Sequence, residues 1–172
     1  MNPVERIKTA IGRGIQAMEL RPTLGRGTAV TRARLRGGLA CEVSDGRWRL
    51  AADMSDRHGG KGTGPDPGVF GRAALASCLT IGYAMWAARM GVVLQSLEVS
   101  VEADYDARGQ YGLSEDPPSY AEVRCKVAIT SPSPRAEVER MVETANRYSP
   151  YLDLFRRPMP VSTELELTST GG

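Results

Sequence analysis

The chain has 172 residues and a mass of 18.6 kDa, a size suited to a single domain spanning residues 1–172 that buries a real core. Apolar residues make up 41% of it and charged residues 24%, which excludes an intrinsically disordered or fibrous protein. The formal net charge is only +2 and the arginines are spread along the chain, so the sequence offers no clustered basic surface for nucleic acid.

The chain begins with a predicted helix and continues into a predicted β-meander. Apolar residues recur at helical spacing over residues 3–20, and Pro22 ends the pattern, so we expect residues 1–22 to form a helical extension. Residues 29–54 instead interleave β-branched and large side chains with polar ones, which indicates a meander of strands. Within it, Asp45-Gly46 is a hairpin signal, because both residues tolerate the positive φ of a tight turn.

A loop rich in glycine and proline, residues 56–68, leads into the predicted central helix. Asp66 can cap this helix and Pro67 fits its first turn, so we expect it to span residues 67–90. Its sixteen consecutive uncharged residues, AALASCLTIGYAMWAA, are fewer than the roughly 20 that cross a bilayer. We therefore interpret it as a buried helix and expect no association with a membrane.

Residues 94–167 are predicted to hold further strands and a second long helix. Apolar and polar residues alternate over 94–106 and again over 120–130, as in half-buried strands. A helix follows, and Ser149 continues its apolar stripe at helical spacing. Residues 159–169 are predicted to close the chain as a strand. This order of elements predicts an α+β fold with helices packed on antiparallel sheets.

Three cysteines, Cys41, Cys78 and Cys125, stand far apart with no CxxC or Cys/His metal spacing. The odd number argues against a closed disulfide framework and favours a reducing, cytoplasmic setting. The N-terminus also lacks the apolar core and cleavage site of a secretory signal. With His58 as the only histidine, neither a metal site nor a Ser-His-Asp triad can be assembled, and we expect no metal and no cofactor.

Taken alone, Cys78 is typical of a packing residue. Cysteine behaves as a small hydrophobe on an apolar helix, and burial there raises its pKa and leaves it unreactive. The residues that share its predicted helical face, such as Leu75, Ile81 and Met85, supply no charge that would activate a thiol. A reactive thiol at this position would need an arginine from elsewhere in the fold.

Several stretches considered together, in their order along the chain, carry a resemblance to a known family. They are the loop GGKGTGPDP, the helix and strand AALASCLTIGYAMWAARMGVVLQSLEVSVEADYD, the strand YAEVRCKVAIT and the segment AEVERMVETANRYSPYLDLFRRPMPVSTELEL. Over about residues 30–167 the chain resembles the OsmC/Ohr family of thiol-dependent hydroperoxide reductases. The resemblance implies an OsmC-like α+β fold in which two chains intertwine as a homodimer, with two active sites at the subunit interface.

The resemblance also implies a chemistry for Cys78, which stands at the family's peroxidatic position. In the family this cysteine attacks the terminal oxygen of an organic hydroperoxide and becomes a sulfenic acid. A second cysteine then captures it as a disulfide, which an external thiol reduces. The reaction needs a thiolate and a cation to stabilise it.

The sequence departs from the family pattern at two positions. The resolving cysteine, which precedes a proline near the end of the second long helix, is replaced here by Ser149, and a serine cannot form a disulfide. The glutamate that follows the proline at the start of the central helix, and helps to hold the activating arginine, is replaced by Gly68. The resemblance places the activating arginine nearest to Arg36.

Other residues are alternatives for the activating cation and for the resolving thiol. Arg32, Arg34 or Arg72 could supply the cation, although Arg72 lies off the helical face of Cys78, and Cys41 or Cys125 could act as a resolving thiol.

The residues and the resemblance together predict two alternative functions. One is an enzyme that reduces organic hydroperoxides through Cys78 alone and is recycled by an external thiol, with activity weakened by the two replacements. The other is a non-catalytic dimer that holds a small hydrophobic ligand in its interface pocket.

Overall fold

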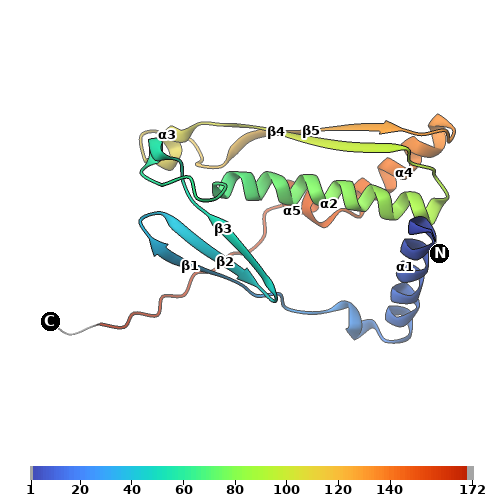
Figure 1. Cartoon of the computed structure of the whole chain (residues 1–172), viewed down its shortest axis with the longest axis horizontal. Helices are drawn as coiled ribbons and strands as arrows, with labels where there is room; N and C mark the ends of the chain where they lie inside the picture. Colours follow the sequence, from blue (N-terminus) through green and yellow to red (C-terminus); the bar gives the residue numbers. More distant parts are fainter. Residues whose placement is uncertain (1, 170–172) are drawn as a thin grey trace.

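The long helix α2 (Pro67–Met90) organises the part of the chain that the structure describes, residues 2–169 of a computed structural model. An antiparallel pair of strands, β4 and β5, runs along one side of α2, and a three-stranded sheet leads away from its N-terminal end (Figure 1). The predicted α+β fold with antiparallel sheets is thus confirmed. The remaining elements are α1 (Pro3–Leu20), β1 (Thr31–Gly37), β2 (Ala40–Asp45), β3 (Trp48–Ala52), β4 (Ser96–Tyr105), α3 (Ala107–Gln110), β5 (Tyr120–Thr130), α4 (Arg135–Arg147) and α5 (Pro150–Arg156).

Both ends of α2 are fixed by the residues that the sequence suggested. The Asp66 side chain accepts a hydrogen bond of 3.0 Å from the Val69 N–H, and Pro67 occupies the first turn, where a missing N–H costs nothing. Gly91 ends the helix at φ 75°, a left-handed conformation that favours glycine. The helix therefore begins and ends at residues whose local chemistry favours a helix terminus.

One face of α2 forms the core of the described chain. Leu75, Leu79 and Tyr83 lie at intervals of four residues and are at most 2% exposed, and Met141 and Ala145 of α4 pack against them. By length and composition α2 is the one described helix that could cross a membrane. Burial of each large side chain among them stabilises the fold by about 1.5–3 kcal/mol, so packing accounts for the apolar residues on this one face of α2.

The strands β4 and β5 cover the same core from the other side. They pair antiparallel, with Val99 opposite Val127 and Val101 opposite Cys125. Three of these residues, all valines, pack against the core cluster of α2 and α4. The alternation in the sequence therefore predicts which face of this sheet is buried.

The three-stranded sheet has the order β1-β2-β3 and is open by comparison. Gly46, at φ 48°, opens the two-residue turn between β2 and β3, close to the predicted hairpin position. The sheet makes no extensive contact with α2, and Leu35 and Trp48 remain 68% and 62% exposed. Its apolar side chains thus have no core to enter within the described chain.

The second long helix is interrupted, contrary to the expectation that Ser149 continues its apolar stripe. Helix α4 ends at Arg147, and a separate short helix, α5, begins at Pro150. The residue before a proline is disfavoured in the helical region, and Ser149 is extended at φ −82°, ψ 115°. Ser149 therefore lies at the junction of the two helices and caps α5.

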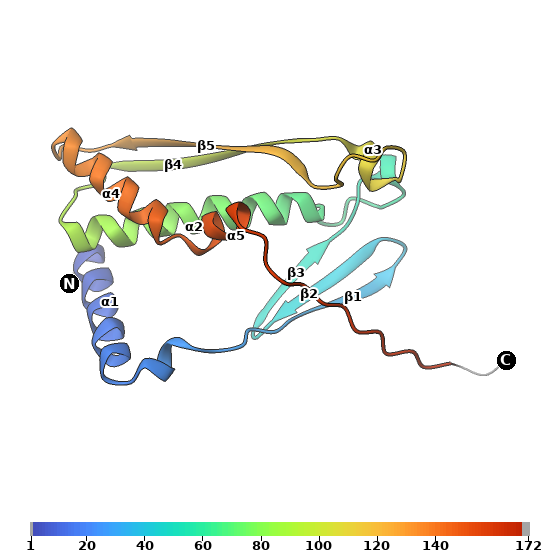
Figure 2. The same ribbon diagram turned by 180° about the vertical axis from the view of Figure 1, so that it is seen from behind.

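The predicted strand over residues 159–169 is wrong for this chain. The segment forms no helix or strand and runs away from the helices towards the C-terminus (Figure 2). Its alternating apolar residues are highly exposed, with Val161 at 85% and Leu165 at 84%. The alternation typical of a strand is present, but none of the strands that the structure describes pairs with it.

The N-terminal helix α1 has the predicted bounds and packs against α2. Its side chains Ile7, Ile11 and Ile15 are half-buried, whereas no residue of the helix is fully buried. The Asn2 side chain caps it by accepting the Glu5 N–H at 2.9 Å.

Candidate active site

Cys78 lies on α2 about 100° around the helix from the face that forms the core, and it is half-buried. Ile81 and Met85, three and seven residues further on, share its side of the helix and are 60% and 40% exposed. The sulfur therefore sits at the border between the packed core and an open apolar surface. This position leaves the thiol within reach of a small molecule.

One polar group contacts the Cys78 sulfur among the described residues, the hydroxyl of Ser149 at 3.7 Å. Ser149 is only 5% exposed, and its Oγ accepts the Leu152 N–H at the first turn of α5 at 3.3 Å. Because the oxygen is engaged as an acceptor there, its O–H can donate to the sulfur. Such a hydrogen bond stabilises a thiolate more than a thiol.

A buried carboxylate, Asp53, holds the loop that leads into α2. It accepts hydrogen bonds from the N–H groups of Met54, Lys61 and Thr63 and from the Thr63 hydroxyl. The Thr63 N–H is the main cause that lowers the pKa of this carboxyl below its usual range, and the other donors act in the same direction. A Cβ at Gly60 would lie 1.9 Å from the Met54 carbonyl oxygen, so the loop needs glycine there.

Asp53 was not predicted from the sequence as a residue of the site, although a signal was present. An acidic residue directly after a strand, followed by a loop rich in N–H donors and glycine, is typical of a carboxylate that organises a turn. The role of Asp53 is structural, because it fixes where α2 begins.

Gly68 lies in the first turn of α2 beside Arg72 and Tyr120. The Arg72 guanidinium donates to the Tyr120 hydroxyl at 3.0 Å, and this hydroxyl donates to the Gly68 carbonyl at 3.2 Å. A Cβ at Gly68 would lie 3.0 Å from an Asp66 oxygen and 3.1 Å from the Arg72 guanidinium. The space that a longer side chain would enter is therefore in use, and Arg72 is directed towards β5 instead of the thiol.

Arg36 lies on β1, away from Cys78, and forms an ion pair of 2.7 Å with Glu42 on β2. Arg32 and Arg34 are exposed on the same strand. Within residues 2–169, no cation is in hydrogen-bond contact with the Cys78 sulfur. A single chain thus brings Ser149 to Cys78 but leaves Arg36 on the open sheet.

The other two cysteines and the histidine lie elsewhere. Cys41 is on β2, opposite Ala52, and Cys125 is on β5, where partial burial raises the pKa of its thiol. All three cysteines are free. The exposed His58 contacts the Ser55 hydroxyl through its Nδ1 at 3.0 Å, within one turn. No group of three metal-binding side chains occurs in the part of the chain that the structure covers.

Cys78 is thus a half-buried cysteine on a long central helix, in contact with the residue that caps α5 at a helix junction. The sequence model of the family described as OsmC-like protein matches residues 60–164, which contain Cys78, Gly68 and Ser149. The chain belongs to the OsmC-like protein family. No curated protein matches it in sequence.

Solved structures of this family share the fold of the OsmC-like chain at low sequence identity. An OsmC-like protein from Mycoplasma pneumoniae has a TM-score of 0.65 at 15% identity, over 76% of this chain and 88% of that one. An OsmC-like protein of unknown function from Vibrio cholerae gives 0.58 at 12% identity, over 75% and 94%. An organic hydroperoxide resistance protein OsmC from Legionella pneumophila gives 0.54 at 20% identity, over 76% and 90%. At these identities the likeness is one of fold.

Proposed function

We propose that this OsmC-like protein is a thiol-dependent peroxidase that reduces organic hydroperoxides at Cys78 without a resolving cysteine. The observation that carries the proposal is the Cys78 sulfur, half-buried beside an open apolar surface and 3.7 Å from the hydroxyl of Ser149. The apolar surroundings suit the organic part of the substrate, and the hydroxyl can donate to the thiolate that attacks.

The reaction proceeds in two halves. The thiolate attacks the terminal oxygen of the hydroperoxide, the O–O bond breaks, and the alkoxide takes a proton to leave as an alcohol. Cysteine is thereby oxidised to a sulfenic acid, and the peroxide is reduced. An external thiol then displaces hydroxide as water and forms a mixed disulfide. A second external thiol releases Cys78 and leaves as a disulfide, so two thiols are consumed for each peroxide.

Ser149 determines how the enzyme is recycled. A serine next to the sulfur forms no disulfide, so the sulfenic acid must persist until an external thiol reaches it. The half-exposed position of Cys78 allows that access. Free cysteines and a need for a thiol reductant both fit a reducing compartment, and we propose that the protein acts in the cytoplasm.

We further propose that two copies intertwine as a homodimer and complete the active site. The exposed apolar side chains of the open sheet and of residues 158–169 support this, because a second copy would bury them. In this arrangement Arg36 of the partner subunit supplies the cation that Cys78 lacks among residues 2–169 of its own chain. Glu42 holds Arg36 at 2.7 Å and takes over the task for which Gly68 provides no carboxylate.

The test follows the loss of cumene hydroperoxide in the presence of dithiothreitol. We expect turnover by the wild type, none above background by Cys78→Ser, and unchanged turnover by Cys41→Ser and Cys125→Ser. Equal rates for the wild type and Cys78→Ser would eliminate the peroxidase. Light scattering gives the oligomeric state, and a stable monomer of 18.6 kDa would contradict the homodimer.

A gain of function tests the role of Ser149 in the same assay. Because its oxygen is 3.7 Å from the sulfur, Ser149→Cys should trap the sulfenic acid as a disulfide with Cys78. Intact mass after treatment with peroxide alone should fall by about 2 Da relative to the reduced variant, whereas the wild type should gain oxygen. A Ser149→Cys protein that gains oxygen as the wild type does would show that position 149 does not face the reactive sulfur.

A further inference from the structure

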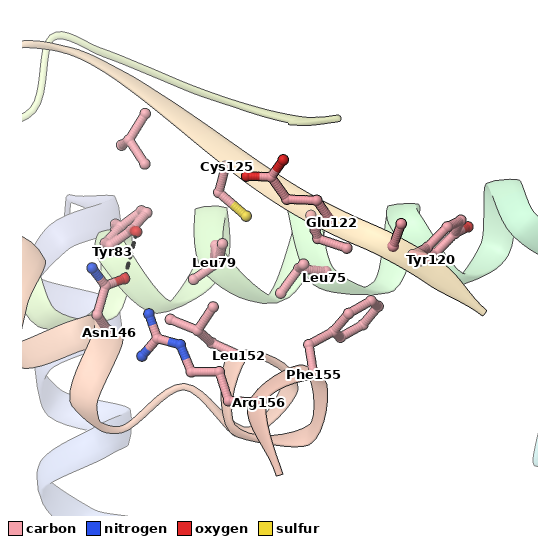
Figure 3. A pocket seen from close by; sticks show the side chains of 13 residues that line it. Leu75, Leu79, Tyr83, Tyr120, Glu122, Cys125, Asn146, Leu152, Phe155 and Arg156 are labelled. Carbon is pink, nitrogen blue, oxygen red and sulfur yellow. Dashed lines mark hydrogen bonds between the residues drawn. The ribbon is translucent and has the colours of Figure 1, made fainter. Parts of the chain in front are cut away.

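A cavity of about 420 Å³ lies between α2, β5 and the α4–α5 segment (Figure 3). Cys78 and Ser149 are not among the residues that line it. Leu75, Leu79 and Tyr83 line it from α2, about 100° around that helix from Cys78. The cavity is therefore distinct from the candidate active site. Its volume falls within the range of about 300–1,000 Å³ that small-molecule sites occupy.

The two ends of the cavity differ in polarity. Figure 3 shows Phe155 and Tyr120 towards one end, and the polar groups of Arg156, Asn146 and Tyr83 gathered at the other. Leucine side chains from α2 and α5 fill the stretch between the ends. The Tyr83 hydroxyl donates to the Asn146 oxygen at 2.7 Å, which fixes both groups at the polar end. An apolar body with one polar end matches an amphipathic ligand.

The polar end carries a positive charge with no counter-charge. Within residues 2–169, Arg156 forms no ion pair. Glu122 is the one acidic residue in the described lining, and its carboxylate pairs at 2.8 Å with Arg124, which also pairs with Glu102 and Asp104. Burial raises the pKa of Tyr83 and of the Cys125 thiol, so both groups are neutral near pH 7. Arg156, which is exposed at the polar end, therefore has no direct ion-pair partner among the described residues of the lining.

We propose that this cavity binds a small amphipathic anion, a carboxylate with an unbranched alkyl chain, with the carboxylate on Arg156 and the chain along Leu75, Leu79 and Leu152. A guanidinium can bind a carboxylate through two parallel hydrogen bonds. A neutral ligand of the same shape would leave the charge of Arg156 uncompensated. The anion is thus favoured over the neutral molecule.

The test measures binding of decanoate to the full-length protein by isothermal titration calorimetry, with 1-decanol as the neutral probe. We expect Arg156→Gln to weaken decanoate binding about tenfold and to leave 1-decanol binding unchanged. Arg157→Gln is the matched control: it removes the same charge one residue away, from a side chain that pairs with Asp153 outside the cavity lining, and should bind decanoate as the wild type does.

Cys125 reports the place of binding, because its thiol lines the cavity. In a Cys41→Ser, Cys78→Ser background, decanoate should slow alkylation of Cys125 by N-ethylmaleimide at pH 8, and Arg156→Gln should abolish this protection. Protection of Cys125 places the bound decanoate in this cavity, because Cys78 is not part of its lining. Absence of decanoate binding, equal affinity for the wild type and Arg156→Gln, or unprotected Cys125 at saturating decanoate would each overturn the proposal.

Discussion

The described chain has two parts with similar apolar residues, which are buried in one part and exposed in the other. In the packed part, formed by α2, α4 and the β4–β5 pair, Leu75 and Met141 are completely buried. In the open part, formed by the β1–β3 sheet and residues 158–169, Leu35 is 68% and Leu167 80% exposed. Both parts alternate apolar and polar residues along their strands, but only the packed part has a core into which the apolar ones can fit.

The difference shows that secondary structure and burial are specified separately. Turns, hydrogen bonds and strand propensity suffice to form the β1–β3 meander without any helix packed against it. Exposing apolar side chains to water costs free energy. The exposed apolar side chains of the open part are therefore typical of a surface that binds a partner. The proposed homodimer would join the two parts, since it brings the Arg36 of one copy to the Cys78 of the other.

The largest expected effect is a difference in the free energy of unfolding between a substitution in the packed part and one in the open part. Leu75→Ala should lower the free energy of unfolding by about 2–5 kcal/mol, because it opens a cavity in a packed core. Leu50→Ala, on β3 and 48% exposed, should cost less than about 1 kcal/mol at low protein concentration. Urea unfolding measures both. Equal losses would contradict the division, and a cost for Leu50→Ala that rises with protein concentration would show that a second copy buries that face.

The second effect is on the rate of the proposed peroxidase reaction, in which Arg36 of the open part would act on Cys78 of the packed part. Arg36→Gln should lower kcat/KM for cumene hydroperoxide by about 100-fold, as expected when a charged donor at the reacting atom is lost. Its pH–rate profile should move to higher pH, because a nearby cation favours the thiolate. Arg34→Gln, from the same strand, is the control and should retain the rate of the wild type. An unchanged rate for Arg36→Gln would leave Cys78 without its proposed cation.

Much of the packed part could be predicted from the sequence, because its signals are local. The cap at Asp66, the stop at Gly91 and the alternation of β4 and β5 each depend on residues close together in the chain. The family resemblance was confirmed by the match over residues 60–164. Where each residue's own neighbours decide its conformation, the pattern is a sufficient guide.

The features that could not be predicted depend on residues far apart in the sequence. The alternation of residues 159–169 is typical of a strand, but a strand needs a partner to pair with, and the five described strands pair only among themselves. The direction of Arg72 towards Tyr120 depends on a hydrogen bond between residues 48 positions apart. The end of α4 before Pro150 could have been predicted from the proline itself. The apolar residues at helical spacing instead favoured a helix that continued to Ser149.

The third effect lies at the junction of the two parts, where Asp53 directly follows β3 and holds the loop before α2. Its pKa is lower in the folded than in the unfolded state, so its contribution to stability is complete above about pH 4 and is lost as the pH falls further. Thermal unfolding should show Asp53→Asn below the wild type at pH 5–8, with the gap closing below about pH 4. Asp56→Asn, exposed in the same loop, should show no such gap. A gap for Asp53→Asn that is independent of pH would mean that shape, not charge, holds the loop.

The smallest expected effect concerns the aromatic stack beside Ser149, which we expect to help hold this residue against the Cys78 sulfur. The rings of Trp86 on α2 and Tyr148, just after α4, stack with centroids 5.3 Å apart, and Arg89 lies 4.0 Å over the Trp86 ring. Tyr148→Ala should cost about 1 kcal/mol. Because Tyr148 adjoins Ser149, losing the stack should also slow formation of the disulfide in Ser149→Cys, measured by intact mass against time. Tyr151→Ala, which loses a 40% exposed ring without a stacking partner among the described residues, is the control. A disulfide that forms equally fast in both would show that the cap on α5 alone holds position 149 against the sulfur.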